Sequence, residues 1–395
     1  MSEDCLCAGS HGGSVVPGCD KSDRACPGTV VQPSGDQHRI DGCLLASTCE
    51  RTDYTVLMHL VWLDENDSSG RSAWDRAHAS ARASLQQHWA YGSAMQSFGA
   101  GCLRCVVMVK DEPRALAQLL VRRWAGVVSA ALCTRGPVWL GTPPDRSSPT
   151  YNEEIVMRRE AHLLIRKSLP LKGLRLVMFS PDSRDEKEAG VDHLHRVMTG
   201  YATVMLDLND EPQKLSERLP GNWYNRLLAA QRSTMKVERI GSKPAQYQWL
   251  LDRDQYQQRQ RGYRSLPKAF VPAFQRACHA FSVSRHSTKR SIGERAGMDA
   301  VFSLRADLGR TPVAAMMFLR HGDTATYHVG WSDPEQRLPG AHNLLLWNAM
   351  MQLRTAGVRS IDLGGVNTAR SAGVARFKIG TGGEVVVLAG TYLAL

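Results

Sequence analysis

The sequence has 395 residues, of which 43% are hydrophobic and 22% charged, and its formal net charge is +11. This composition is that of a globular protein with a sizeable core and room for two or three domains. No uninterrupted apolar run approaches the roughly 18 residues that a membrane-spanning helix needs, because Arg122 and Arg123 interrupt the best candidate. The positive charge suits a polyanionic partner such as tRNA or a phosphorylated small molecule, although a solvated basic surface explains it equally well.

The first fifty residues differ in composition from the rest of the chain. They hold six of the ten cysteines and are rich in glycine, serine and proline, without helical or strand periodicity. The cysteine spacings are irregular for a zinc module, and Cys102 and Cys105 form one lone CxxC. We therefore predict reduced, structurally incidental thiols, and a segment 1–50 that is either a disordered extension or an over-long gene start. The start lacks the basic and then apolar pattern of a secretory signal, so we expect a cytoplasmic protein.

Two later stretches share one order of elements. Residues 105–141 and residues 300–332 each contain a β-rich run, a turn with aspartate and proline, and an apolar run that ends in arginine. A glycine-bearing turn and a third β-rich run near a glycine and a tryptophan follow in both. These signals predict a three-stranded antiparallel meander in each stretch.

The first meander is followed by a predicted helix and strand. Residues 150–170 have an apolar stripe at every third or fourth position, made by Met157, Ala161 and Leu164. Thr150 and Glu153 have the spacing of a capping box at the start of this helix. The apolar residues 174–180 predict the strand that follows.

The second meander is followed in the same way. Here the stripe is Leu344, Trp347 and Met351, and Gly357 ends the predicted helix. Residues 358–363 predict the next strand.

Meander, helix and strand, twice over, predict an α+β fold of two similar units rather than a doubly wound sheet. We place the first unit at 51–200 and the second at 241–395. A strand and a basic helix in 201–240 would bridge them. We expect the protein to be a monomer.

This order of elements resembles the GCN5-related N-acyltransferase (GNAT) fold, in which a meander carries the substrates and the next helix starts at the acyl donor. Two such units in tandem resemble the FemABX-type aminoacyltransferases over roughly residues 85–392. The resemblance is carried by an ordered set of motifs: LQQHWAYG, TRGPVWLG, WYNRLLAAQR, ATYHVGWS, AHNLLLWNAM, GVRSIDLGG and GVARFKIGTGG.

Members of that family transfer an amino acid from aminoacyl-tRNA to an amine of a peptidoglycan precursor. The resemblance therefore implies an acyltransferase of cell-wall peptidoglycan biosynthesis, with the second unit catalytic. Because the donor ester is already activated, we expect direct attack by the amine, with no metal, cofactor or covalent nucleophile. The basic charge is also compatible with contact with a membrane surface that carries a lipid-linked acceptor.

Four residues of the second unit are candidates for the chemistry. Lys378 would stabilise the oxyanion or bind a phosphate, and the glycines after it would let the backbone approach the ligand. Asp362, at a strand end, would orient the amine or accept its proton. The resemblance implies a substrate contact for Phe377, beside Lys378. Tyr327, on the third meander strand, would line the donor or amine channel, whereas His328 alternates to the other face.

Arg135, Arg226 and Trp139 are candidates for binding the acceptor. The two arginines would bind its phosphate or carboxylate, although each is equally compatible with a surface ion pair, and Trp139 would be core or pocket wall.

The loop before the helix that follows the second meander indicates which acyl donor is used. Enzymes of this fold that use acyl-CoA carry an R/Q-x-x-G-x-G/A loop there, which holds pyrophosphate. Arg337 and Gly340 fit that pattern, but His342 replaces the second small residue and Pro339 removes a backbone donor. This favours aminoacyl-tRNA. The alternatives are an acyl-CoA-dependent N-acyltransferase acting on a small amine, and a non-catalytic protein that binds tRNA or an envelope precursor.

Overall fold

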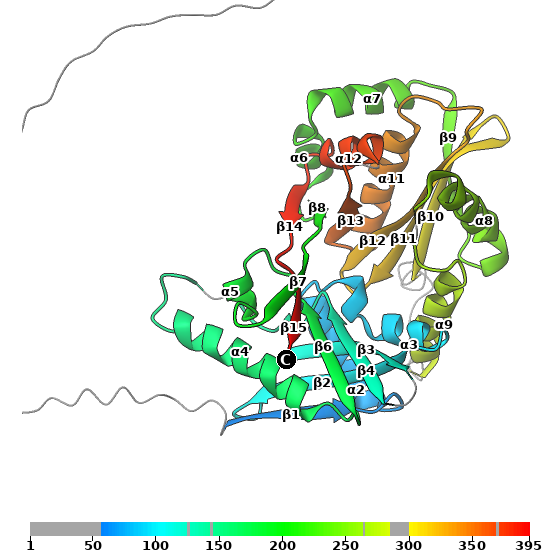
Figure 1. Ribbon diagram of the computed structural model, residues 1–395. Coiled ribbons are helices and arrows are strands. Elements are labelled where there is room, and N and C mark those ends of the chain that lie inside the picture. Colours follow the sequence, from blue (N-terminus) through cyan, green and yellow to red (C-terminus); the bar gives the residue numbers. More distant parts are fainter. Residues whose placement is uncertain (1–56, 125–126, 143–144, 264, 285–299, 369–370) are drawn as a thin grey trace, which may run out of the picture. The chain divides into compact units, whose positions relative to one another are not determined.

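The computed structural model (Figure 1) describes residues 57–124, 127–142, 145–263, 265–284, 300–368 and 371–395. Residues 52–395 form one compact unit. The cysteine-rich segment 1–50 lies outside the described residues, so what we predict for it stays a prediction. Within the described part, no helix is long and apolar enough to cross a membrane.

The first sheet has eight strands in the order β1-β2-β3-β4-β6-β15-β7, with β5 paired to β3. Its core meander β2-β3-β4 is antiparallel, as predicted. The strands are β1 (Met58–Leu63), β2 (Gly101–Val109), β3 (Glu112–Trp124), β4 (Val128–Thr134), β5 (Val138–Trp139), β6 (Leu174–Ser180), β7 (His195–Thr199) and β15 (Gly390–Ala394).

The second sheet has seven strands in the order β14-β8-β13-β12-β11-β10-β9. Its meander β10-β11-β12 is likewise antiparallel, and β13 joins it in parallel, as β6 joins β4 in the first sheet. The strands are β8 (Ala202–Asp207), β9 (Met235–Ile240), β10 (Val301–Leu308), β11 (Thr311–His321), β12 (Thr324–Ser332), β13 (Ser360–Val366) and β14 (Glu384–Val387).

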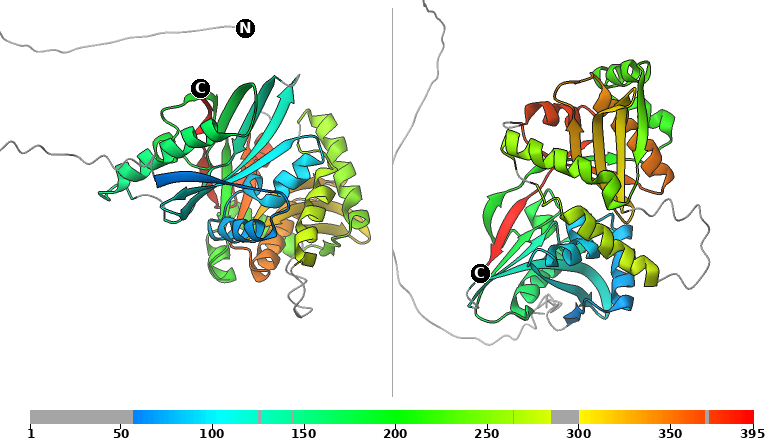
Figure 2. Two further views of the ribbon diagram at one scale, coloured as in Figure 1. Left: turned by 90° about the horizontal axis from the view of Figure 1, so that it is seen from below. Right: turned by 90° about the vertical axis from the view of Figure 1, so that its right-hand side faces the viewer.

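The helices divide between two halves of the unit. The first half is the first sheet with α2 (Ser68–Ser80), η1 (Leu85–Gln87), α3 (Trp89–Gln96), α4 (Tyr151–Ser168) and α5 (Glu186–Ala189). The second half is the second sheet with α6 (Pro212–Glu217), α7 (Gly221–Gln231), α8 (Pro244–Arg261), α9 (Phe270–Ser284), α11 (Ala341–Thr355) and α12 (Ala372–Ile379). Figure 2 shows α8 and α9 beside the second sheet, and residues of both helices share one core cluster with β11 and β12.

Every second side chain of β4 is buried, and α4 covers that face of the first sheet. Ala131 and Cys133 are fully buried in the cluster that contains Met157 and Ala161 of α4, so the predicted apolar stripe packs on the sheet. The predicted capping box is wrong. Thr150 is the N-cap, but its side chain makes no cap hydrogen bond, because its hydroxyl pairs with that of Ser148 at 2.8 Å.

The prediction for α11 is correct in position and partly correct in its buried face. Leu344 is buried, whereas Trp347 and Met351 are only half-buried against the same cluster. The helix packs between the sheet and α7 and buries a wider face, whose fully buried side chains include Leu345, Leu346, Ala349 and Leu353. Gly357 follows the helix with φ of 90°, a conformation that glycine adopts without strain.

The strand and helix expected to bridge the two halves both belong to the second half. β8 lies inside the second sheet between β13 and β14, and α7 packs on α11. The connection is made instead by a two-stranded ribbon, in which β7-β8 runs antiparallel to β15-β14. Gly200 and Gly390 lie where the ribbon passes between the sheets. A Cβ on Gly200 would lie 1.6 Å from the Leu388 carbonyl oxygen, so the close approach requires glycine.

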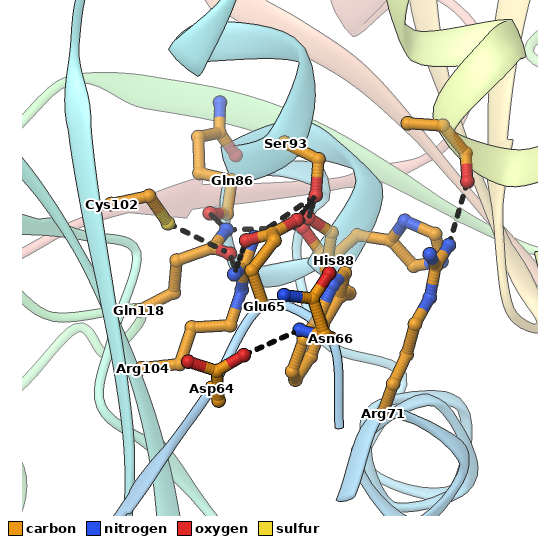
Figure 3. Close-up of polar contacts among 12 residues, drawn as sticks. Asp64, Glu65, Asn66, Arg71, Gln86, His88, Ser93, Cys102, Arg104 and Gln118 are labelled. Carbon is orange, nitrogen blue, oxygen red and sulfur yellow. Dashed lines mark hydrogen bonds and ion pairs between the residues drawn. The ribbon is translucent and has the colours of Figure 1, made fainter. Parts of the chain in front are cut away.

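A buried polar network holds α3 against the first sheet (Figure 3). Arg104 on β2 is 2% exposed, and it donates to Gln118 Oε1 at 2.7 Å and to the Trp89 carbonyl at 3.0 Å. It also pairs with Glu65 and bonds Ser93. Because its donors are used within the protein, this arginine is structural.

Candidate active site

The two central strands of the second sheet separate at Asp362. β12 and β13 pair in parallel only from Thr324↔Ser360 to Thr326↔Asp362. Immediately beyond, β12 has a bulge at His328, and the pairing of β13 with β8 shifts register after Asp362. Bulges bend a strand and end pairing locally. The sheet is therefore open at this point, between Tyr327 on one strand and Gly364 on the other.

Lys378 reaches the opening from α12. Its side chain is buried, and Nζ donates to the Gly365 carbonyl oxygen at 2.9 Å and lies 5.5 Å from the Tyr327 ring centroid. Burial lowers the pKa of Lys378 to about 8, and the negative charge of Asp362 opposes that shift. Lys378 lies on the helix α12, where Ala375 and Lys378, three residues apart, form one buried face.

The glycines after Lys378 have a packing role. A Cβ on Gly382 would lie 2.7 Å from the Arg218 carbonyl oxygen, and one on Gly383 would lie 2.8 Å from that of Met205. Gly382 also has φ of 74°. Backbone packing thus accounts for glycine on one side of these residues, while both also line a cavity of about 370 Å³. The expectation that they bring the backbone close to a ligand stays a prediction.

Asp362 is a buried carboxylate that accepts three hydrogen bonds. Thr203 Oγ1 donates at 2.5 Å and the Gly364 backbone N–H at 2.7 Å, both to Oδ1. Arg135 Nη1 donates to Oδ2 at 3.2 Å. Three donors thus fix the orientation of this carboxylate. Its position next to the opening, and its effect on the pKa of Lys378, fit an electrostatic role.

Arg135 joins the two halves. Its Nε lies 2.7 Å from Asp182 Oδ1, and its Nη1 donates to Tyr201 Oη at 2.7 Å and to Asp362. Burial alone would lower the pKa of Arg135, but the carboxylates of Asp182 and Asp362 raise it above its usual value. We predicted that this arginine would bind a phosphate or carboxylate of the acceptor. Two carboxylates of the protein already occupy it.

A cavity of about 420 Å³ lies at the ends of β4 and β6 in the first half. Arg135 and Trp139 line it, together with Arg82, Arg158 and Asp182. Trp139 is half-buried, with the Arg158 guanidinium 4.8 Å from its ring centroid, so it forms cavity wall as expected. Arg135 thus contacts this cavity on one side and Asp362 on the other.

Phe377 and Tyr327 differ in what they contact. Phe377 packs toward Trp223 and His342, with ring centroids 6.2 and 5.9 Å away, which is a core position beside α11. Tyr327 faces Lys378, and a Cβ on Gly330 would lie 1.6 Å from its hydroxyl, so Gly330 leaves the space that the phenol fills. His328 lies on the opposite face near Phe270, as alternation predicted.

The predicted donor residues lie around the start of α11. Gly340 is the N-cap with φ of 79°, and a Cβ there would lie 2.5 Å from the Arg226 carbonyl oxygen, so this glycine lets α11 pack on α7. Arg226 and Arg337 are both exposed and make no ion pair with another described residue. His342 points back to β12, where its Nε2 lies 2.6 Å from Ser332 Oγ.

Three residues of the site were not predicted from the sequence: Asp182, Thr203 and Tyr201. Each contacts Arg135 or Asp362 from a segment distant in the chain. Asp182 lies two residues beyond β6, whereas Asp362 lies inside β13, so the internal repeat relates the two strands but not the two aspartates. In the described part of the chain, no group of three or more histidine, cysteine or carboxylate side chains is arranged to hold a metal ion.

Comparison with known proteins bears on the fold. Residues 224–379 match the acetyltransferase (GNAT) domain family. The crystal structure of FemX superposes with a TM-score of 0.63 at 12% identity, over 85% of this chain and 96% of that one. A conserved protein of unknown function from Bacteroides thetaiotaomicron gives 0.50 at 13% identity, over 85% and 99%. No curated protein sequence matches.

These matches support the predicted fold class. The fold is α+β with two GNAT-like units in tandem, and the domain match makes the protein an acyltransferase.

Proposed function

We propose that this protein is a FemABX-type N-acyltransferase, which transfers an aminoacyl group from aminoacyl-tRNA to an amine of a peptidoglycan precursor or related peptide. The observation that carries the proposal is the buried Lys378 Nζ in the opening between β12 and β13, 2.9 Å from the Gly365 carbonyl. A buried cation at a sheet opening is suited to stabilise developing negative charge.

The reaction is a direct displacement. The neutral amine attacks the carbonyl carbon of the donor ester, an N–C bond forms, and the negative charge that develops on the carbonyl oxygen is stabilised by the Lys378 ammonium. The C–O bond to the ribose then breaks, the ribose hydroxyl takes a proton, and the amine loses one. Asp362 keeps Lys378 more protonated than burial alone would allow. Tyr327 forms the wall of the opening.

The loop before α11 supports aminoacyl-tRNA over acyl-CoA. The Ala341 backbone N–H donates to the Leu338 carbonyl at 3.3 Å, so one donor that would hold pyrophosphate is already used. His342 is turned onto Ser332 rather than leaving open space. The exposed, unpaired Arg226 and Arg337 beside this loop suit a polyanionic donor with a spread phosphate backbone.

The first-half cavity is our proposed acceptor site. Its lining contains three arginines and the carboxylates of Asp182 and Glu188. Arg135 and Arg158 pair with described carboxylates, so Arg82 is the arginine that would bind an anionic group of the acceptor, such as a phosphate of a phosphorylated sugar peptide. Arg135 would act there by positioning, since Asp182 and Asp362 pair with it. The structural likeness to FemX is consistent with this class of acceptor.

A labelled transfer assay on the full chain tests the proposal. Charged total tRNA and acetyl-CoA are offered separately, each with a peptidoglycan-precursor pentapeptide and with a pool of small amines. Label that passes from tRNA to the pentapeptide, and is lost in Lys378→Ala, is the expected result. Label that passes only from acetyl-CoA would instead establish the alternative N-acyltransferase, which the retained Arg337 and Gly340 favour. Binding of tRNA without any transfer would support a non-catalytic role.

A further inference from the structure

One end of the first sheet presents an exposed apolar row. Its members are Trp124 at the end of β3 (54% exposed), Val127 just before β4 (61%) and Leu174 at the start of β6 (62%). They are neighbours: Trp124 pairs with Val128, Val128 pairs with Leu174, and the Leu174 N–H donates to the Val127 carbonyl at 2.9 Å. We call Trp124, Val127 and Leu174 the tip row. Exposed apolar side chains that adjoin in this way mark a contact surface rather than scattered surface residues.

The chain segments that carry the tip row contain cationic residues and no acidic ones. Residues 120–130 and 163–175 contain no aspartate or glutamate. They contain six cationic residues, Arg122, Arg123, Arg166, Lys167, Lys172 and Arg175. None of the six makes an ion pair with a described carboxylate, whereas Arg146 at the same half of the chain pairs with both Asp185 and Glu188.

We propose that the tip row docks on the surface of an anionic lipid bilayer. Tryptophan is favoured at the level of the lipid headgroups, aliphatic side chains enter the boundary of the acyl chains, and each lysine or arginine near an anionic surface adds to the attraction. The tip row and its unpaired cations supply all three groups at one end of one sheet.

Two other partners fit the same surface less well. A second copy of the chain in a two-fold contact would bring the same six cations against one another, which repel. A nucleic acid would pair with the cations but would leave Val127 and Leu174 without an apolar partner.

The docked orientation has a consequence for the active site. β4 runs from Val128, beside the tip row, to Thr134, next to Arg135. Six steps of about 3.3 Å place Thr134, which Arg135 follows, about 20 Å from the tip row along the strand. The amine of a lipid-carried acceptor would have to reach that far from the bilayer surface. This link to the acceptor rests on the proposed function, whereas the docking itself does not, because vesicle binding needs neither donor nor acceptor.

Co-sedimentation of the full chain with vesicles tests the proposal. Vesicles of phosphatidylcholine alone are compared with vesicles that contain about 30% phosphatidylglycerol, in about 0.1 M and about 0.5 M salt. We expect binding only to the anionic vesicles, weakened by salt. The double variant Trp124→Ser, Lys172→Glu should bind at least about tenfold more weakly. The matched control is Tyr256→Ser, Arg259→Glu on α8, which removes an equally exposed aromatic ring and a cation and should bind as the unchanged protein does.

A spectroscopic readout separates docking of the tip row from general attraction. Brominated lipids quench tryptophan that enters the bilayer, so quenching should be present in the unchanged protein and reduced in Trp124→Phe. Thermal melts of each variant confirm that it is folded. The proposal is overturned if the full chain binds no anionic vesicle, if the Trp124→Ser, Lys172→Glu variant and its control bind alike, or if the variant instead abolishes self-association or RNA binding.

Discussion

The same pair of parallel strands is closed in the first half and open in the second. β4 and β6 pair without a break over seven positions, from Val128↔Leu174 to Thr134↔Ser180. β12 and β13 pair over three positions and then separate at a bulge. Of these two strand pairs, only the one in the second half separates, and the buried Lys378 lies in that half. This difference, rather than the fold that the halves share, indicates where chemistry takes place.

The halves also differ in how they balance charge. Lys378 is a buried cation whose ammonium donates to a backbone carbonyl. Arg135, from the first half, is held by Asp182 of its own half and Asp362 of the other. The first half therefore supplies a cation that fixes the carboxylate beside Lys378, and the site is complete only with both halves.

The largest expected effect is on catalysis, from Lys378→Ala. Loss of a charge donor to the oxyanion should lower the rate of transfer by about 10²–10³. The matched control is Arg376→Ala, which removes an exposed cation from the same helix and should leave the rate within about twofold. Single-turnover label transfer measures both. Equal rates for the two variants would mean that the opening in the second half is not where transfer occurs.

The next effect is on stability, from Arg135→Met. It leaves the buried carboxylate of Asp362 and the partly exposed one of Asp182 without their counter-charge, so we expect a loss of about 3 kcal/mol in the free energy of unfolding, the low end for breaking a buried pair. Urea denaturation measures it. The double variant Arg135→Met, Asp182→Asn should lose less than Arg135→Met alone, since one orphaned charge is removed with its partner. A double variant that is less stable than both single variants would contradict the ion-pair assignment.

A pH-dependent effect on stability is expected from the histidines between the halves. His78 and His88 of the first half lie 5.7 and 6.3 Å from His321 of the second, centroid to centroid. Burial lowers the pKa of His78 and of His88 to about 3. Protonation therefore favours the unfolded chain, where the pKa is about 6.5, and stability should fall as pH drops from 6.5 toward 3. Urea midpoints between pH 7.5 and pH 4.5 test this, and midpoints that do not fall with acidity would contradict it.

The smallest effect should come from Tyr201→Phe. This removes one hydrogen bond to Arg135 from a ring that is 44% exposed, so we expect a loss of about 1 kcal/mol in stability. A larger loss, comparable with that of Arg135→Met, would show that Tyr201 rather than the carboxylates holds the guanidinium.

Local pattern predicted much of the fold. Alternation and turn residues located both meanders, and helical periodicity with Gly357 located α11, because these signals depend on neighbours in the chain. The internal repeat predicted the fold class for the same reason. Lys378 and Asp362 were chosen as the site, and the structure places both beside the opening.

Contacts between distant segments were not predictable in this way. The ribbon of β7-β8 with β15-β14 depends on the C-terminal strand entering the first sheet, which no local pattern encodes. Arg135 has the sequence character of a phosphate binder, and only the fold shows Asp182 and Asp362 around it. The glycines after Lys378 suggest close approach of a ligand, and only the fold shows that the backbone at Arg218 and Met205 also packs against Gly382 and Gly383.

The central claim is that the Lys378 ammonium stabilises the oxyanion, and a pH–rate profile of single-turnover transfer tests it most directly. Because the pKa of Lys378 is lowered to about 8, the rate should fall as pH rises through about 8 and the ammonium loses its proton. In Lys378→Arg, whose guanidinium stays protonated, whatever activity remains should not fall in that range. A profile with the same falling limb in both proteins would contradict the claim.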